Sequence, residues 1–227
     1  MALIHRTTMR PTKLELLADW LPTRAWYAAG PHAPRPVKAG GFRLDDPEGE
    51  VGVEFMVVTD GEGPDAVAYL VPMTYRGKPL DGAEQALIGT SEHGVLGTRW
   101  IYDGAHDPVL VGTLYALLAG RAVPQQQSVS DAVDPTVAAV LDASAVTPGD
   151  PEPLGAVDAA GHTDIRLRAG DGAEPLTLRL RRVLRPAAEG GDDTALGTVT
   201  AEWTPAGPEN SPERTPVRGA FVTVHRP

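Results

Sequence analysis

The stretch EVGVEFMVVTDGEGPDAVAYLVPMTYR, residues 50–76, decides the fold class. In its first part, apolar residues alternate along one side at Val51, Val53, Phe55 and Val57. Alternation with a period of two is typical of strands, and the turn DGEGPD between the two parts favours an antiparallel hairpin. The second strand should place these side chains on one face: Val67, Tyr69, Val71 and Met73. Pro72 predicts a sheet edge or a bulge there, because proline has no N–H to donate.

One helix is expected before this hairpin in the sequence and one after it. Thr12 and Glu15 make a capping box before an apolar helix that Pro22 ends. Asp107 stands where an N-cap belongs and Pro108 at the first helical position, ahead of a leucine-rich run that Gly120 closes. Between the hairpin and this second helix we expect a long glycine-rich loop and then the strand TRWIYD, residues 98–103.

The second half reads as β-rich. Periodicity fades from Pro124 to Pro153, which predicts a Pro-rich linker or crossover (124–153) between domains at 1–123 and 154–227. TDIRLRAGDGAEPLTLRLRRVLRP (163–186) then predicts a hairpin with its leucines inward and its arginines outward. Two further strands are expected at 196–203 and 218–226. The fold class is therefore α+β, an antiparallel sheet with packed helices followed by a β-rich C-terminal part.

Composition excludes several classes of protein. The chain has 227 residues, 42% of them hydrophobic, which is enough for a sizeable core. Its net charge of −10 disfavours nucleic acid or an anionic membrane as a partner. It has no cysteine, so disulfides, thiol nucleophiles and thiolate zinc sites are excluded. The N-terminal sequence lacks an apolar run long enough for a signal or a span, and we expect a cytoplasmic protein.

One segment gathers residue types that do chemistry: Glu92, His93, Asp103, His106 and Asp107. Such side chains ligate metals or transfer protons. However, the two histidines stand thirteen positions apart, and no i, i+4 pair on a helix fixes them. We expect these residues to cap turns and hydrogen-bond loop backbone instead, with neither a metal nor a cofactor. For Asp107, alanine should then cost about 0.5–2 kcal/mol and asparagine much less, because asparagine also caps helices.

Other catalytic patterns are weak. GTSEHGVLG (89–97) has glycines at spacings of five and three, but no Lys-Ser or Lys-Thr follows to complete a phosphate loop. DDPEGE (45–50) offers carboxylates in the composition of a solvated turn. No serine lies in a Gly-x-Ser-x-Gly elbow. We assign no catalytic residue from these patterns.

Two further groups are candidates for ligand binding. Arg166, Arg168, Arg179 and Arg181 could hold a phosphate or carboxylate if they share one face, although such residues are also typical of the wet face of a sheet with paired acids. Aromatic side chains could stack on sugar rings, although with 5% aromatics most are needed for packing. The aromatic residues concerned are Trp20, Trp26, Tyr27, Trp100 and Tyr102.

Three stretches in this order resemble a known family. They are HRTTMRPTKLELLADWLPTRAWYAAG (5–30), AYLVPMTYRGKPLDGAEQALIG (68–89) and RWIYDGAHDPVLVGTLYALLAG (99–120). Together they are similar to the N-terminal cap domain of actinobacterial maltokinases, and more closely to stand-alone proteins described as maltokinase N-terminal cap-like. The resemblance covers about residues 1–121. The family's Gly-Lys pair is replaced after Tyr27 by Ala28, Ala29, Gly30 and then Pro31.

The resemblance implies a curved antiparallel sheet with helices against it, similar to a cystatin fold. It does not imply kinase activity, since the kinase body needs a His-Gly-Asp-x-His type loop. Here GHTDIRLR (161–168) has Thr163 in place of the glycine and Arg166 in place of the second histidine. We therefore expect a non-catalytic accessory or regulatory module, linked to maltose, glycogen or trehalose metabolism through a protein or saccharide partner. The alternative is a hydrolase or transferase in which Glu92, His93, Asp103 and His106 converge in one pocket.

Overall fold

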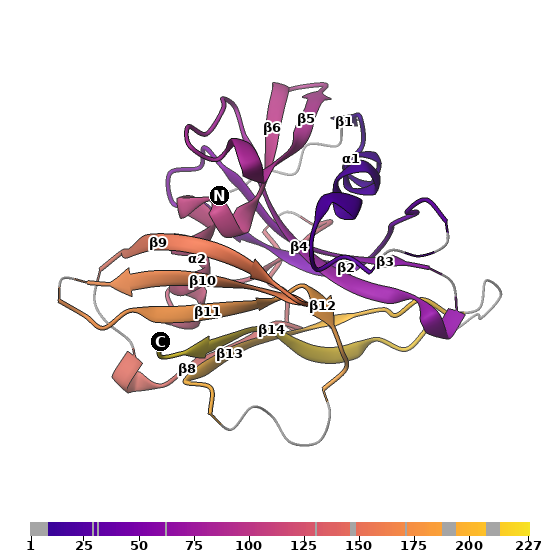
Figure 1. Cartoon of the computed structure of the whole chain (residues 1–227). Helices are drawn as coiled ribbons and strands as arrows, with labels where there is room; N and C mark the ends of the chain where they lie inside the picture. The colour runs from indigo at the N-terminus through magenta and orange to yellow at the C-terminus, as the bar shows by residue number, and fades with distance from the viewer. Residues whose placement is uncertain are drawn as a thin grey trace.

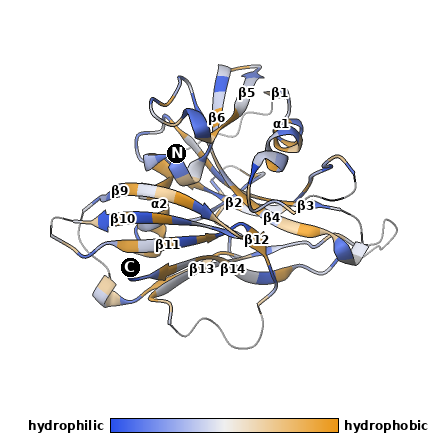
Figure 2. Ribbon diagram, in the orientation of Figure 1, coloured by the Kyte–Doolittle hydropathy of each residue, from blue (hydrophilic) through white to orange (hydrophobic). Residues whose placement is uncertain are grey.

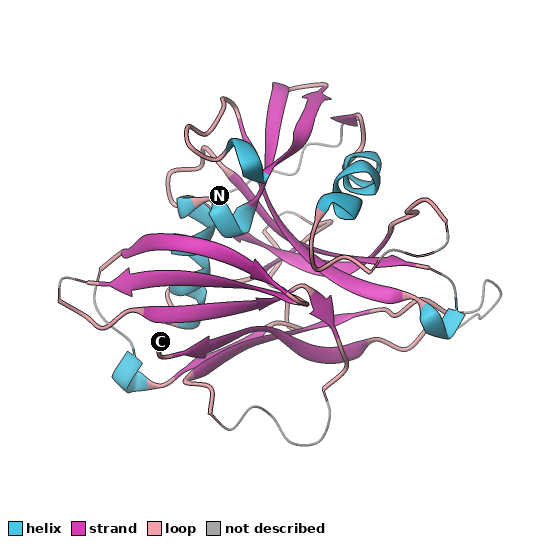
Figure 3. Cartoon of the chain, in the orientation of Figure 1, coloured by secondary structure: helices cyan, strands magenta, loops and turns pink. Residues whose placement is uncertain are grey.

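The computed structural model describes residues 9–28, 30, 32–61, 63–129, 131–145, 149–170, 172–187, 194–207 and 214–227. Residues 5–8, Ala29 and Pro31, which belong to the segments used for the resemblance, lie outside the described residues. Strands dominate the molecule, and they join in one 14-stranded sheet (Figure 1, Figure 3). The fold is therefore α+β and rich in β-structure.

The first half supplies strands on either side of the expected hairpin. They are β1 (Met9–Arg10), β2 (Val37–Asp45), β3 (Gly52–Asp60), β4 (Val67–Arg76), β5 (Leu87–His93) and β6 (Gly97–Asp103). β3 and β4 pair antiparallel from Gly52↔Tyr75 to Asp60↔Val67, as predicted. One-turn 3-10 helices connect several elements: η1 (Leu21–Thr23), η2 (Gly63–Asp65), η3 (Glu84–Ala86) and η4 (Gly104–His106).

Helix α1 (Lys13–Trp20) covers one face of β3 and β4. The predicted capping box is present, with Thr12 and Glu15 each accepting from the other's backbone N–H. Leu17 and Leu21 are fully buried and pack with residues of the two strands, including Val58 and Val71. Burial of a leucine stabilises by roughly 1.5–3 kcal/mol, so this contact anchors a helix too short to persist alone.

Helix α2 (Pro108–Leu118) lies in the core. Asp107 caps it, Pro108 opens it, and Gly120 follows with a φ of +69°, all as predicted, although the helix ends at Leu118 instead of near Arg121. It is apolar around most of its circumference, and such helices are buried on all sides. Seven of its residues are buried: Leu110, Val111, Thr113, Leu114, Tyr115, Leu117 and Leu118.

The second half continues the same sheet. Its strands are β7 (Gln125–Gln126), β8 (Ala138–Leu141), β9 (Pro151–Ala159), β10 (His162–Ala169), β11 (Leu176–Arg181), β12 (Val183–Leu184), β13 (Gly197–Trp203) and β14 (Val217–His225), with a 3-10 turn, η5 (Ala143–Ala145). The order is β1-β5-β6-β4-β3-β2-β13-β14-β11-β10-β9. The predicted linker, 124–153, contributes β7, which pairs with β2, and β8, which pairs with β13.

The two halves share one large core around α2. Phe42 of β2 stacks on Phe55 at 4.6 Å between ring centroids and approaches Phe221 of β14 at 6.1 Å. The inward leucines of β11 alternate with half-buried residues, as predicted, and belong to the same cluster. In Figure 1, α2 lies behind β9, β10 and β11. One sheet and one core run through both halves of the chain. The division into two domains separated by residues 124–153 stays a prediction.

Some expectations were wrong. The segment expected as a long loop contains β5, which pairs with β6 from Leu87↔Tyr102 to His93↔Gly97. Pro72 lies in an interior strand with regular pairing to Phe55, neither at an edge nor at a bulge. On its other side, the Leu70 N–H donates to Arg182 of the β11–β12 connection, and β6 pairing begins at Met73. Pro72 stands where one neighbour ends and the other begins, so a donor is not required there.

Candidate functional site

The residues suggested for acid and base chemistry do not come together. Glu92 and His93 lie at one end of β5, opposite Thr98 and Gly97, whereas Asp103 ends β6 and His106 follows in η4. The six residue-to-residue steps from Gly97 to Asp103 span roughly 20 Å at about 3.3 Å each. The pocket that the enzyme alternative requires from all four side chains is therefore not formed.

Glu92 and His93 stabilise the turn between β5 and β6. The Thr98 hydroxyl donates to Glu92 Oε1 at 2.7 Å. His93 Nδ1 accepts from the backbone N–H groups of Val95 at 3.3 Å and Leu96 at 3.1 Å. These bonds are of the loop-capping kind expected for the segment.

Asp103 is the first of two buried carboxylates near α2. Its Oδ1 accepts from the Ala105 N–H at 3.2 Å, and its Oδ2 accepts from Arg182 Nη2 at 2.5 Å. Arg182 is fully buried; its Nε donates to the Thr163 hydroxyl at 2.7 Å, and its guanidinium lies 4.9 Å from the Trp26 ring centroid. Because a buried charge needs a partner, this pair joins β6 to the β11–β12 connection and fixes the two halves together.

Sequence reasoning did not select Arg182, although a signal was present. In LRLRR (178–182) the leucines alternate with outward arginines, so the second of two consecutive arginines must point inward. An arginine on the core side of a strand requires an acid from elsewhere. That acid, Asp103, is 79 positions away, which no local pattern reveals.

Asp107 makes an ion pair in addition to the predicted helix cap. Its Oδ1 accepts from the Val109 N–H at 2.9 Å, and both carboxylate oxygens accept from Arg76 of β4, at 2.6 Å each. Asp107 is fully buried, and its hydrogen bond raises the pKa of Arg76. The expectation of a mild Asp107→Asn change is therefore corrected, because asparagine would keep the cap and lose the bidentate ion pair.

The aromatic candidates are mostly packed. Trp26 is 3% exposed, between Trp20 at 5.7 Å and Tyr69 at 6.0 Å. Tyr27 is half-buried and donates its hydroxyl to Asp60 Oδ2 at 2.6 Å, and burial together with Asp60 raises its pKa. Trp100 is half-buried beside a small cluster around Tyr102. Tyr27 and Trp100 thus offer part of a ring to solvent, and Trp26 does not.

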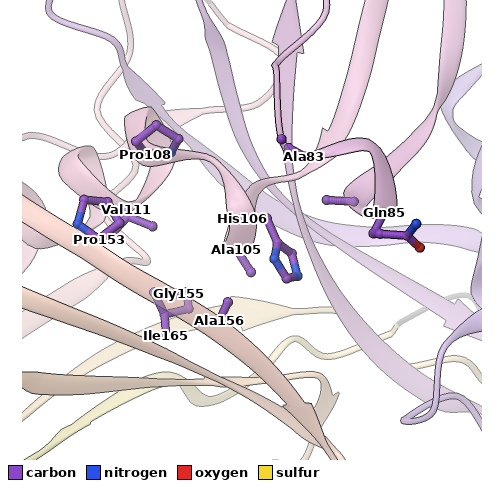
Figure 4. A pocket seen from close by; sticks show the side chains of 12 residues that line it. Ala83, Gln85, Ala105, His106, Pro108, Val111, Pro153, Gly155, Ala156 and Ile165 are labelled. Carbon is purple, nitrogen blue, oxygen red and sulfur yellow. The ribbon is translucent and has the colours of Figure 1, made fainter.

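A cavity of about 250 Å³, here called the junction cavity, lies between the two halves (Figure 4). It is lined by Gly82, Ala83, Gln85, Ala86, Ala105, His106, Pro108, Val111, Pro153, Gly155, Ala156 and Ile165. Among these, His106 is the titratable group and Gln85 the other polar side chain. The cavity can admit a small group, but one imidazole supplies neither an acid–base pair nor a metal site. In the described part of the chain, no group of three histidine or acidic residues is placed to hold a metal ion.

The arginine candidates share a face. Thr163, Ile165 and Leu167 of β10 are buried, which turns the residues between them outward. The register places Arg166 opposite Thr177, Asp164 opposite Arg179 and His162 opposite Arg181. Arg179 binds Asp164 through two bonds of 2.8 Å, and Arg168 binds Glu152 at 3.0 Å. The expected pairing with acids is thus present for these two arginines.

The same strand contains the partial kinase-like motif. Thr163 is buried, where its hydroxyl donates to Asp158 at 2.6 Å, and Asp164 is engaged by Arg179. The hydrogen bonds from Arg179 hold the pKa of Asp164 below its usual range. A carboxylate paired in the middle of a strand stabilises the sheet and is not placed as a catalytic base.

A buried charge cluster around Glu54 of β3 was also missed. Glu54 is 3% exposed and accepts from Lys13 Nζ at 2.7 Å, from the Tyr75 hydroxyl and from Gln127 Nε2 at 3.0 Å. Burial by itself raises the pKa of Glu54, but Lys13, Tyr75 and Lys38 outweigh it, and the pKa lies below its ordinary value. The cluster ties α1 and the segment after β7 to the sheet. Its partners lie 41 and 73 positions from Glu54, too far for a pattern in the sequence.

The comparisons with known proteins agree with the first half of this description. The family model described as the maltokinase N-terminal cap domain matches residues 20–107, from the end of α1 to the cap of α2. None of the curated proteins matches the chain. Among the described residues, neither α-helix has the length and apolar character needed to cross a membrane. Residues 20–107 are therefore similar to the maltokinase N-terminal cap domain.

Proposed function

We propose that this chain is a non-catalytic accessory or regulatory module of maltose, glycogen or trehalose metabolism that acts by binding a partner. The observation that supports the proposal is the match of residues 20–107 to the cap domain, continued by strands that complete the same sheet and core. On this proposal the cap-like half has a cystatin-like arrangement, and the protein works in the cytoplasm of an actinobacterium without a cofactor.

A binding role suits the charged residues of the 92–107 segment. Asp103 and Asp107 are buried and held by Arg182 and Arg76, and Glu92 and His93 stabilise a turn. Groups engaged in this way stabilise the fold, and Asp103 and Asp107 would have to break their ion pairs to take part in proton transfer. A protein is the favoured partner over a saccharide, because Trp26 is packed in the core and Tyr27 and Trp100 are each half-buried.

The test is a pair of assays on the full chain. Incubated with magnesium-ATP and maltose, glucose or glucosamine, the protein should form no phosphorylated sugar, and robust turnover would contradict the proposal. Calorimetry with maltooligosaccharides then separates the two partner classes, with Trp100→Ala as the variant that removes a half-exposed ring. Heat of binding lost in Trp100→Ala would move the proposal to a saccharide partner. A pull-down from the native cytosol identifies a protein partner.

One observation favours the alternative of a small-molecule hydrolase or transferase, and it is the junction cavity beside the exposed His106. That enzyme would depend on His106 for proton transfer. Any hydrolytic activity found in a substrate screen should then disappear in His106→Ala, whereas an activity that persists belongs to a contaminant or another site.

A further inference from the structure

The outward side of β10 and β11 is an arginine-rich surface on an acidic protein. We call it the basic face and define it by Arg166, Arg168, Arg179 and Arg181. Arg179 is paired with Asp164 and Arg168 with Glu152, on a chain that carries −10 as a whole. In Figure 1, β9, β10 and β11 face the viewer, and Figure 2 shows hydrophilic positions along β10.

The basic face is open to solvent. Arg166 is exposed and makes no side-chain hydrogen bond or ion pair with any described residue. The Arg168 and Arg179 side chains are 39% and 35% exposed within their pairs. Exposed pairs of this kind contribute about 0–1 kcal/mol, so carboxylates of a partner can join or replace them at little cost.

Spacing along the face matches an extended chain. Arg166 and Arg168 are two residues apart on one strand, and Arg179 and Arg181 are two apart on the next. Same-side positions of a strand repeat at roughly 6.6 Å, and the side chains of an extended peptide repeat at the same distance. Arg179 already holds Asp164 by two parallel bonds, which is the arrangement a guanidinium makes with a carboxylate.

We infer that the basic face binds an extended acidic segment of a partner protein, with alternate Asp or Glu side chains on the arginines. The inference rests on the proposed function in one respect, namely that the chain acts by binding. At physiological salt the Debye length is about 8 Å, so charges interact only over short distances. A short acidic peptide on the basic face therefore interacts mainly with its arginines and little with the acidic remainder of the molecule. Nucleic acid or an anionic membrane extends past the face to the acidic remainder of the molecule and is repelled there.

The test is fluorescence anisotropy of the full chain with a labelled peptide of alternating glutamate and serine. Saturable binding that weakens with added salt is expected, and none with the matching glutamine-serine peptide. Arg166→Glu/Arg181→Glu should weaken binding at least about tenfold, because two favourable charge contacts become repulsive. The control Arg35→Glu/Lys78→Glu makes the same change of charge at exposed positions of the cap-like half and should stay within about twofold of the parent.

Arg166→Lys/Arg181→Lys separates charge from geometry. A several-fold loss is expected, since lysine keeps the charge and lacks the fork that matches a carboxylate. The inference is overturned if the parent does not bind the acidic peptide, if both charge-reversal pairs weaken binding equally, or if duplex DNA or phosphatidylserine vesicles bind more tightly than the peptide. A partner captured equally by the parent and by Arg166→Glu/Arg181→Glu would refute the face and leave the proposed function standing.

Discussion

The cap-like half (residues up to 123) and the β-rich half (residues from 154) differ in where their charged side chains lie. In the cap-like half, Glu54, Asp103 and Asp107 are at most 3% exposed, and each is held by a cation from a distant segment. In the β-rich half, Arg168 and Arg179 lie on an open surface with acids from neighbouring strands. A buried ion pair is costly to break and an exposed pair contributes little, so the first set holds the fold and the second set is available for binding.

Arg182→Met should have the largest effect of the changes that break this comparison. It leaves Asp103 buried without its cation, at a cost of about 3–5 kcal/mol in the free energy of unfolding. Asp103→Asn/Arg182→Met removes both charges and should recover part of this loss, because apolar replacement of a whole buried pair is often tolerated. Urea denaturation measures both variants. If Arg182→Met were as stable as the parent, the Asp103–Arg182 ion pair would not join the two halves.

The carboxylate of Asp107 has two functions, the cap of α2 and the ion pair with Arg76, and two variants separate them. Asp107→Ala loses the helix cap and the partner of Arg76, and should cost roughly 2–4 kcal/mol. Asp107→Asn keeps the cap and loses the ion pair, at roughly 1.5–3 kcal/mol. Thermal and urea unfolding of the two variants separate the contributions. If asparagine matched the parent, the capping bond alone would account for the burial of Asp107.

The stability that the buried Glu54 contributes to the folded protein depends on pH. Its pKa in the folded protein lies below the ordinary value, so the stability it contributes is present above about pH 4.3 and is lost as pH falls through the folded pKa. Glu54→Gln should cost roughly 1.5–3 kcal/mol at neutral pH. It should also flatten the decline of stability between about pH 5 and 3. Urea midpoints measured across this range give the answer, and an unchanged acid slope in the variant would contradict the role of Glu54.

Local signals in the sequence were sufficient for part of the fold. The capping box at Thr12 and Glu15, the β3–β4 alternation and the Asp107-Pro108 start of α2 are short-range patterns, and all were confirmed. β5 was missed because LIGTSEH mixes a glycine with polar residues, and its strand depends on pairing with β6. β9 was missed because PEPLGAVDA has the prolines and glycine of a loop, which an edge strand tolerates.

The candidate site was less predictable than the fold. The sequence grouped Glu92, His93, Asp103 and His106 because they are close along the chain, but the length of β6 separates them. The partners that decide their roles come from far away, as Arg76 and Arg182 show. By contrast, the shared face of Arg166, Arg168, Arg179 and Arg181 follows from alternation, which is local.

Arg181 and Arg182 allow the most direct measurement, because Arg181 ends β11 on its half-buried outward side, whereas the next residue, Arg182, is fully buried. The free energy of unfolding and the affinity for the glutamate-serine peptide should be measured for Arg181→Met and Arg182→Met in parallel. We expect Arg181→Met to weaken the peptide complex while stability changes by less than about 1 kcal/mol. Arg182→Met should lose about 3–5 kcal/mol while its folded fraction binds the peptide as the parent does. Equal losses of stability in the two variants, or unchanged peptide affinity in Arg181→Met, would contradict the division between charges that hold the fold and charges that bind.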